Sequence, residues 1–332
     1  MDTYVAPPGT KGRERSPLVT GAVVQGPKGQ NRPAGSVVTK LSAKNRAQRK
    51  SNQQSNPAKQ VVPHRARVIA VTSGKGGVGK SNLVANLAMG ISRLGKSVLA
   101  FDADLGMANL DVLFGVRPRY TLYHVLKGKK ELLDIIIAGA PGVKFIAGGS
   151  GMAELADMEK NDKERFIEEL RKLERYTDVI VIDTGAGLSS NVISFVRAAD
   201  EVVLVTTPEP TAMADAYGIL KTLASTGEAF PTTNLIVNRV RTPEEGAFVA
   251  RRIAKVSNEF LQVKVGYGGF VIEDPVVTKA VRAQKPFLGY APNALASVCV
   301  CNIVANLFNS KVVLPKRSSA TFFERLAGVF RG

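Results

Sequence analysis

Residues Gly74–Ser81 have the types and spacing that bind the phosphates of a nucleotide. The stretch reads G-K-G-G-V-G-K-S, follows the apolar run Val68–Thr72 and precedes a predicted helix over Asn82–Leu94. Glycines let backbone N–H groups face phosphate oxygens without an intervening side chain, and the helix start adds its positive dipole end. In the motif G-x-x-x-x-G-K-[ST], Lys80 reaches the terminal phosphates and the Ser81 hydroxyl ligates Mg²⁺. The residues expected to line the phosphates are Gly74, Lys75, Gly76, Gly77, Val78, Gly79, Lys80, Ser81 and Asn82.

Three aspartates follow predicted buried strands, at the sheet edge where a ligand lies. Asp102 and Asp104 stand in F-D-A-D after the second strand, and Asp183 follows the apolar run V-I-V-I. Carboxylates in such positions hold Mg²⁺ through water or orient an attacking water. We expect Asp102 and Asp183 beside the metal, although a turn or helix cap would also explain Asp102 and Asp104. The turn Thr184–Gly187 can then sense the terminal phosphate.

The elements that position these residues alternate between strands and helices. Several predicted strands are continuous β-branched runs, as expected for strands covered on both faces of a parallel sheet. Helical stretches such as Lys163–Arg175 and Ala212–Ala224 lie between them, and Thr211 can cap the second. The pattern predicts one doubly wound α/β domain over residues 66–310. The predicted strands are Val68–Thr72, Ser97–Phe101, Val143–Ile146, Val179–Ile182, Glu201–Thr206, Asn234–Val237 and Val263–Tyr267.

The positive charge of the chain is concentrated near its N-terminus. The 332 residues carry a formal net charge of +17, and residues 1–67 hold 13 Lys and Arg against 2 acids, a net +11 (13 minus 2). Residues 1–65 are rich in Pro, Gly, Ser and Gln, so we expect a disordered basic tail. Such a tail can contact nucleic acid or anionic lipid, although a solvated segment is the simpler interpretation.

Cysteine usage and hydropathy argue against several classes of protein. Cys299 and Cys301 are the only cysteines and lie two apart in an apolar helical pattern, which favours reduced thiols over ligands of an iron–sulfur cluster. No run approaches the roughly 18 apolar residues of a membrane span. The N-terminus lacks the apolar core of a signal peptide, so we expect a cytoplasmic protein.

The last residues form a separate amphipathic element. Residues 311–320 are a predicted linker, and Thr321 with Glu324 fits a capping box at the start of a helix over 321–332. So short a helix is not stable alone in water and must fold on a surface. An anionic membrane is favoured over the protein's own body, because a mobile linker and a terminal position suit reversible docking. The apolar face comprises Phe322, Phe323, Leu326, Val329 and Phe330.

The phosphate loop resembles that of the MinD/ParA ATPase superfamily, because a lysine, Lys75, precedes G-G-V-G-K-S. The resemblance implies a Mg²⁺-dependent ATPase that forms a homodimer around ATP, in which Lys75 reaches the phosphates of the partner. It also implies that Asp104 polarises the attacking water, so that the catalytic residues are Lys75, Lys80 and Asp104. The positions implied for adenine are Asn238, Arg239 and Asp274.

Three longer phrases resemble the flagellar-number regulators of the FlhG group, also called FleN or YlxH. They are Gly139–Leu155, D-T-G-A-G-L-S from Asp183, and T-P-E-P-T-A-M-A-D-A-Y from Thr207. The resemblance implies reversible attachment to the inner face of the cell membrane, an FlhF-type GTPase as partner, and contact with flagellar basal-body components. The segment D-Q-A-x-x-L-R, which engages that GTPase in the group, is absent from Met1–Arg67.

Related functions stay open at this point. A MinD-type protein would regulate the site of cell division, and a ParA-type protein would partition DNA. The basic tail permits binding to nucleic acid, whereas the terminal amphipathic helix favours a membrane. A nucleotide-dependent scaffold without turnover would apply if Asp104 were dispensable for hydrolysis.

Overall fold

A computed structural model describes residues 65–104, 109–148, 160–226, 229–309 and 320–331. The predicted tail and linker therefore lie outside the described residues, except for Arg65 and Ala320. The strands are β1 (Arg67–Ser73), β2 (Val98–Ala103), β3 (Ile137–Ala138), β4 (Val143–Ala147), β5 (Val179–Ala186), β6 (Glu201–Thr206), β7 (Thr232–Val240) and β8 (Val265–Ile272).

These strands form the expected doubly wound sheet. Their order is β3-β4-β2-β5-β1-β6-β7-β8. Among the described strands, only β3 pairs in the antiparallel direction. The chain places strands first on one side of β1 and later on the other, which is the change of direction at which α/β sheets bind ligands. Because β1, β2 and β5 run parallel, their carboxyl ends meet at one edge, where a ligand is expected.

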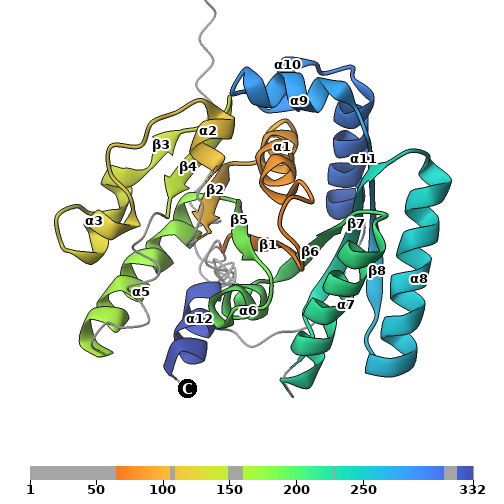
Figure 1. The fold of residues 1–332 in the computed structure, drawn as a ribbon. Coiled ribbons are helices and arrows are strands. Elements are labelled where there is room, and N and C mark those ends of the chain that lie inside the picture. The colour runs from red at the N-terminus through yellow and green to blue at the C-terminus, as the bar shows by residue number, and fades with distance from the viewer. Residues whose placement is uncertain (1–64, 105–108, 149–159, 227–228, 310–319, 332) are drawn as a thin grey trace, which may run out of the picture. The chain divides into compact units, whose positions relative to one another are not determined.

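Helices cover both faces of the sheet (Figure 1). Each face has its own apolar layer, because successive side chains of a strand point to opposite sides. One layer contains α1 (Lys80–Ser92), α2 (Leu110–Phe114), α9 (Pro275–Arg282), α10 (Phe287–Tyr290) and α11 (Leu295–Asn309). The opposite side holds α3 (Leu122–Leu126), the 3-10 helix η1 (Leu132–Ile135), α5 (Lys160–Tyr176), α6 (Ser190–Ala198), α7 (Pro210–Ser225), α8 (Pro243–Leu261) and α12 (Phe322–Arg331).

Most predicted elements agree with the structure to within a few residues, and the start of α7 is an instructive difference. The helix begins at Pro210, with Glu209 as its N-cap residue, rather than at Ala212. Proline is favoured in the first turn because its missing N–H would have no helical partner there. Thr211 is therefore inside the helix, and its hydroxyl contacts another loop instead of capping this one.

The C-terminal helix α12 packs on the protein, not away from it as the sequence led us to expect. Phe322 is 0% exposed, and Phe323 and Leu326 are each 1% exposed. The ring of Phe322 stacks on Phe195 of α6 at 6.4 Å between centroids. The side chains of Val329 and Phe330 lie outside the described residues. Burial of three large apolar groups gives this short helix the surface that it requires, and here that surface is the protein itself.

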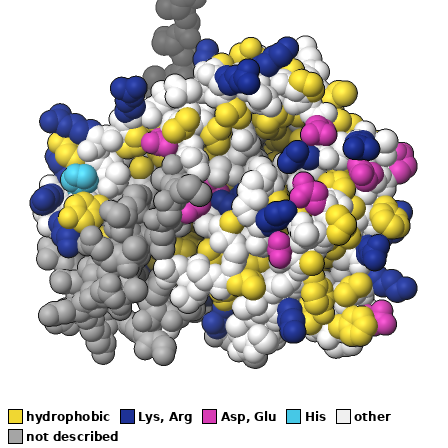
Figure 2. Space-filling view, viewed as in Figure 1, with side chains coloured by type: hydrophobic (Ala, Val, Ile, Leu, Met, Phe, Trp, Pro, Cys, Tyr) yellow, Lys and Arg dark blue, Asp and Glu magenta, His cyan; other side chains and the backbone are white. Residues whose placement is uncertain are grey.

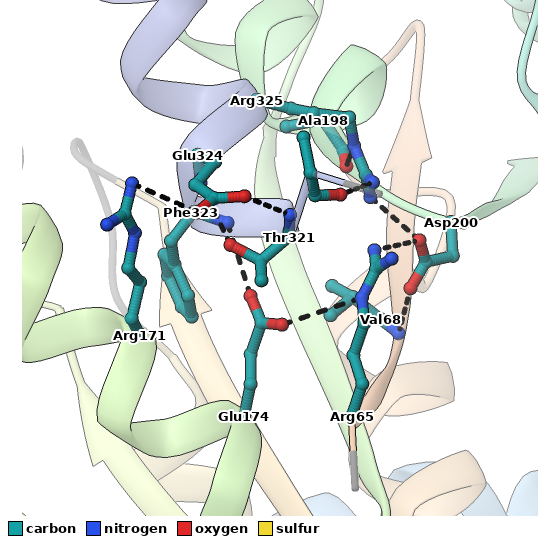
Figure 3. A network of polar contacts seen from close by, with 11 residues as sticks. Arg65, Val68, Arg171, Glu174, Ala198, Asp200, Thr321, Phe323, Glu324 and Arg325 are labelled. Atoms are coloured by element: carbon teal, nitrogen blue, oxygen red, sulfur yellow. Dashed lines mark hydrogen bonds and ion pairs between the residues drawn. The ribbon is translucent and has the colours of Figure 1, made fainter. Parts of the chain in front are cut away.

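Polar contacts fix α12 at its first turn (Figure 3). The capping box is formed, since Thr321 N donates to Glu324 at 2.6 Å and Glu324 N donates to the Thr321 hydroxyl at 3.2 Å. Glu174 of α5 accepts the N–H of Phe323 at 3.3 Å. Arg325 donates to the carbonyl of Ala198 at 2.8 Å and to the Asp200 carboxylate at 2.7 Å. The docked position is thus specified by directional bonds as well as by apolar contact.

Two further sequence expectations concern the thiols and the membrane. Cys299 is buried and Cys301 is exposed, both are unbridged, and no cluster of three or more His, Cys, Asp or Glu ligands occurs among the described residues. In the part of the chain that the structure describes, no helix combines the length and apolar character needed to span a bilayer.

Candidate nucleotide-binding site

The glycine-rich loop joins β1 to α1 in the geometry that the motif requires. Gly77 and Gly79 have φ angles of 79° and 91°, in the left-handed region that side chains rarely adopt. The helix starts at Lys80 directly after Gly79. Asn238 at the end of β7 donates its side-chain N–H to the carbonyl of Val78 at 2.7 Å, so a residue expected at adenine also holds the loop.

Lys80, Ser81 and Asp183 meet beneath this loop. The Lys80 ammonium lies 2.5 Å from the Asp183 carboxylate, and both side chains are buried. Burial raises the pKa of the Asp183 carboxyl, against the opposing effects of Lys80 and of the nearby Ser81 hydroxyl. The second carboxylate oxygen of Asp183 is buried and has no hydrogen-bond partner among the described residues.

Asp102 of β2 and Asp104, which directly follows that strand, lie beside this cluster. Asp102 stands opposite Asp183 in the β2–β5 register. Its carboxylate accepts the backbone N–H groups of Asp104, Asn109 and Leu110 at 3.1–3.2 Å. Asp104 is close enough to Asp183 to raise its pKa. Asp102 therefore does stabilise the turn that follows it, and it also lies next to the carboxylates of Asp104 and Asp183.

This donor set fits Mg²⁺. The hydroxyl of Ser81 and the carboxylates of Asp102 and Asp183 offer the hard oxygen atoms that Mg²⁺ prefers, and one Asp183 oxygen, which has no partner within the described residues, can accept a bond from the ion or its water. Mg²⁺ usually keeps several waters and binds through one or two protein groups together with nucleotide phosphates. A bound Mg²⁺ would neutralise the charge that develops on those phosphates.

We expect Asp102 to make the stability of the ligand-free protein fall as pH rises. Burial, and next the Asp183 charge, raise the pKa of Asp102 from 3.8 to about 7. The folded protein therefore binds this proton more tightly than the unfolded chain, and the stabilisation is lost as pH rises through 7. The loss amounts to about 1.4 kcal/mol in the free energy of unfolding between about pH 6 and about pH 8.

Urea unfolding of the wild type and of Asp102→Asn at both pH values measures this effect. The variant should lack that part of the pH dependence, whatever its absolute stability. Equal slopes for the two proteins would show that Asp102 is ionised in the fold throughout this range.

A cavity next to the loop suits the base of the nucleotide. Its volume is about 320 Å³, within the usual range for ligand pockets. Asn238, Arg239 and Asp274, the positions that the resemblance implied for adenine, all line it. Arg239 has a left-handed φ of 58° and pairs with Glu273 across 3.5 Å. Both oxygens of Asp274 accept backbone N–H groups, from Val276 and Ala296, so this residue shapes the cavity wall.

Lys75, the loop lysine, points away from this cluster and toward α7. Its ammonium lies 3.2 Å from the Glu209 carboxylate and 3.0 Å from the Thr211 hydroxyl. The Lys75 and Glu209 side chains are 42% and 52% exposed, so the ion pair is screened and contributes at most about 1 kcal/mol. The sequence did not predict either partner, because each lies more than 130 residues from Lys75 and no local pattern indicates the contact.

The contact between the loop and α7 predicts a cost for Gly74→Ala. A Cβ at Gly74 would lie 2.2 Å from the backbone oxygen of Asp215, which cannot move alone because it belongs to α7. We expect this overpacking to destabilise the nucleotide-free protein by about 1–3 kcal/mol. Gly76→Ala is the matched control, because a Cβ there meets nothing within 4 Å. Thermal unfolding without nucleotide compares the two variants, and equal midpoints would contradict the close approach.

Comparison with known proteins agrees with this geometry. A family model described as an AAA domain matches residues 66–235. The antiactivator FleN of Pseudomonas aeruginosa is 37% identical over 264 residues, covering 79% of this chain and 94% of that protein. The flagellum site-determining protein YlxH of Helicobacter pylori is 39% identical over 267 residues, covering 78% and 89%.

A solved structure shares the fold. The septum site-determining protein MinD of Pyrococcus horikoshii, complexed with Mg-ADP, is 26% identical with a TM-score of 0.59, covering 76% of this chain and 100% of that one. These similarities agree with two features of the site, which are the extra lysine of the phosphate loop and the buried Lys80–Asp183 pair. This chain therefore belongs to the MinD/ParA superfamily of P-loop ATPases, in the group that contains FleN and YlxH.

Proposed function

We propose that the protein is a switch that regulates the number or placement of flagella. ATP and Mg²⁺ join two copies, the ATP-bound dimer attaches to the inner face of the cell membrane, and hydrolysis to ADP and phosphate separates the copies. The names of its relatives, antiactivator FleN and flagellum site-determining protein YlxH, support the flagellar assignment. An FlhF-type GTPase and basal-body components are the partners that we expect.

The position of Lys75 is the observation that carries this proposal. Lys75 belongs to the phosphate loop but does not face the site of its own subunit, so it can bind the nucleotide of another copy. Its contact with Glu209 and Thr211 is exposed and weak, so a stronger anion, the triphosphate of a second copy, would displace it. In the dimer each Lys75 would stabilise the charge that develops on the phosphates of the partner.

The remaining roles follow from the cluster under the loop. Lys80 would bind the terminal phosphates, Ser81 and Asp183 would hold Mg²⁺, and Asp104 would orient the attacking water. This role for Asp104 is supported by its position beside Gly185, near the end of β5 and just before the turn that follows that strand. Gly187 N of that turn donates to Ser73 O at 2.9 Å, so the turn and the phosphate loop are directly connected.

Membrane attachment through α12 requires that this helix first leave the protein. Its apolar face is buried, and its bonds to Glu174, Ala198 and Asp200 must break. We propose that dimer formation in ATP shifts α12 from the docked to the released state. Two released helices on one dimer then bind a membrane far better than one, because the second binds at a high effective concentration.

Co-sedimentation with phosphatidylglycerol-containing vesicles tests the proposal. Binding should be strong in ATP with Mg²⁺, weak in ADP, and lost in a chain that ends before Thr321. Binding that is indifferent to both nucleotide and truncation would refute the membrane part of the proposal and leave the ATPase assignment intact.

Arg325→Ala should release α12 without ATP. Arg325 bonds to Ala198, Asp200 and Ala320, whereas the apolar face of the helix does not depend on it. Loss of bonds to a charged group costs about 1.5–3 kcal/mol, so we expect vesicle binding in ADP to rise roughly tenfold or more. Lys172→Ala on the neighbouring α5 is the control, since the half-exposed Lys172 pairs with Glu169 of its own helix. An Arg325→Ala protein that still needs ATP would show that other contacts govern release.

A further inference from the structure

A cluster of cations and tyrosines surrounds α3. This cluster is not part of the nucleotide site. Between Val112 and Lys130 the sequence has five Lys or Arg and no Asp or Glu. At the left edge of Figure 2, Lys and Arg side chains gather around a histidine over α3. We call this surface the α3 patch; it consists of Arg117, Arg119, Tyr120, Tyr123, Lys127, Lys129 and Lys130.

The backbone that carries the α3 patch is held in place from below. Leu122, Val125 and Leu132 are buried in the apolar layer beneath it. The chain leaves α3 through Gly128, whose φ of 65° permits a tight left-handed turn, and Lys129 N donates to His124 O at 2.9 Å. This turn brings cations from both sides of the helix onto one surface, so the patch is a defined feature of the fold.

The cations of the α3 patch lie over its tyrosine rings. Lys130 is 4.5 Å and Arg119 is 5.4 Å from the ring centre of Tyr120, and Lys127 is 5.5 Å from that of Tyr123. These ring faces are therefore covered, which disfavours the stacking of nucleobases that single-stranded nucleic acid would need. Tyrosine beside lysine and arginine is instead the composition found at membrane–water interfaces, where the cations meet lipid phosphates.

The α3 patch and α12 lie on the same side of the sheet. Leu122 and Val125 of α3 share one apolar layer with Phe322 and Leu326 of α12, and α5 contacts both helices. Figure 1 shows α3, α5 and α12 as neighbours on that side. A membrane that receives the released α12 would therefore face the patch. We infer that the α3 patch is a second membrane-contact surface, which binds anionic lipid headgroups; this inference rests on the proposed membrane attachment.

Three exposed cations of the patch can be removed without touching the apolar layer. We would compare the full chain with Arg119→Gln/Lys127→Gln/Lys129→Gln in co-sedimentation with phosphatidylcholine vesicles, with and without phosphatidylglycerol, in ATP and in ADP. The matched control replaces three exposed cations on and after α8, Arg251→Gln/Lys255→Gln/Lys264→Gln. The attraction of each cation to an anionic surface corresponds to about a fivefold change in binding, so the patch variant should bind at least roughly tenfold more weakly.

The possible outcomes separate failure of the α3 patch as a membrane-contact surface from failure of the proposed function. Loss in the patch variant alone, seen only with phosphatidylglycerol, supports the α3 patch. ATP-dependent binding that the patch variant retains, or that both variants lose equally, overturns the patch and leaves the proposed function standing. Patch-dependent binding that ignores the nucleotide supports the patch and contradicts the ATP-driven release of α12.

Two further results would overturn the inference. No binding of the wild type to anionic vesicles removes both membrane proposals. A random-sequence DNA duplex that binds more tightly than the vesicles, and whose binding the patch variant loses, would assign the α3 patch to nucleic acid. Thermal unfolding of both variants controls for folding, since neither replaces a buried residue.

Discussion

Lys75→Ala is expected to lower ATP turnover roughly 100-fold or more, because a cation that neutralises transferring phosphate is among the largest contributions to phosphoryl transfer. The variant should fold normally, since the exposed contact of Lys75 with Glu209 contributes at most about 1 kcal/mol. It should also bind ATP, because Lys80, Asn238 and the cavity are unaltered. The defect should therefore appear in turnover and in dimer formation together.

Measurement of three quantities separates this account from its alternatives. Steady-state phosphate release gives turnover, nucleotide titration gives ATP affinity, and light scattering with a non-hydrolysable ATP analogue gives the mass of the complex. Lys221→Ala, an exposed lysine near the other end of α7, is the control for the loss of a surface charge. A Lys75→Ala protein that still dimerises and hydrolyses ATP like the wild type would refute the proposed exchange of lysines.

Phe322→Ala should detach α12 from the protein. Phe322 is fully buried against Phe195 and Phe323, and removal of such a ring costs about 3–5 kcal/mol. This cost exceeds what most single bonds of the helix contribute, so undocking of α12 is the expected response. Phe260→Ala is the control, because that ring on α8 is 67% exposed.

A fluorophore on α12 reports the detachment directly. Gly328 is exposed and a side chain there meets nothing within 4 Å, so Gly328→Cys in a Cys301→Ser background gives one accessible labelling site among the described residues. Mobility of the label should rise in Phe322→Ala and in Arg325→Ala, but only Arg325→Ala keeps the apolar face needed for lipid. Unchanged mobility and unfolding free energy in Phe322→Ala would show that α12 is held by other contacts.

The sequence by itself determined the sheet and the geometry of the glycine-rich loop. Short-range geometry controls both: glycine φ angles shape the loop, a helix begins at Lys80, and buried apolar runs place Asp102 and Asp183 in the carboxyl-terminal halves of their strands. The carboxyl ends of neighbouring parallel strands meet at one edge, so residues far apart in sequence could be assigned to one cluster without coordinates.

Only the tertiary structure decided what Lys75, Asp274 and α12 contact. An amphipathic pattern shows that Phe322 and Leu326 need an apolar surface, but a membrane and the layer beneath α5 and α6 satisfy that need equally well. The structure selects the second through Glu174, Asp200 and Phe195, none of which is local to the helix. The physical reason is that side-chain partners more than 100 residues apart are fixed by packing, on which local propensity carries no information.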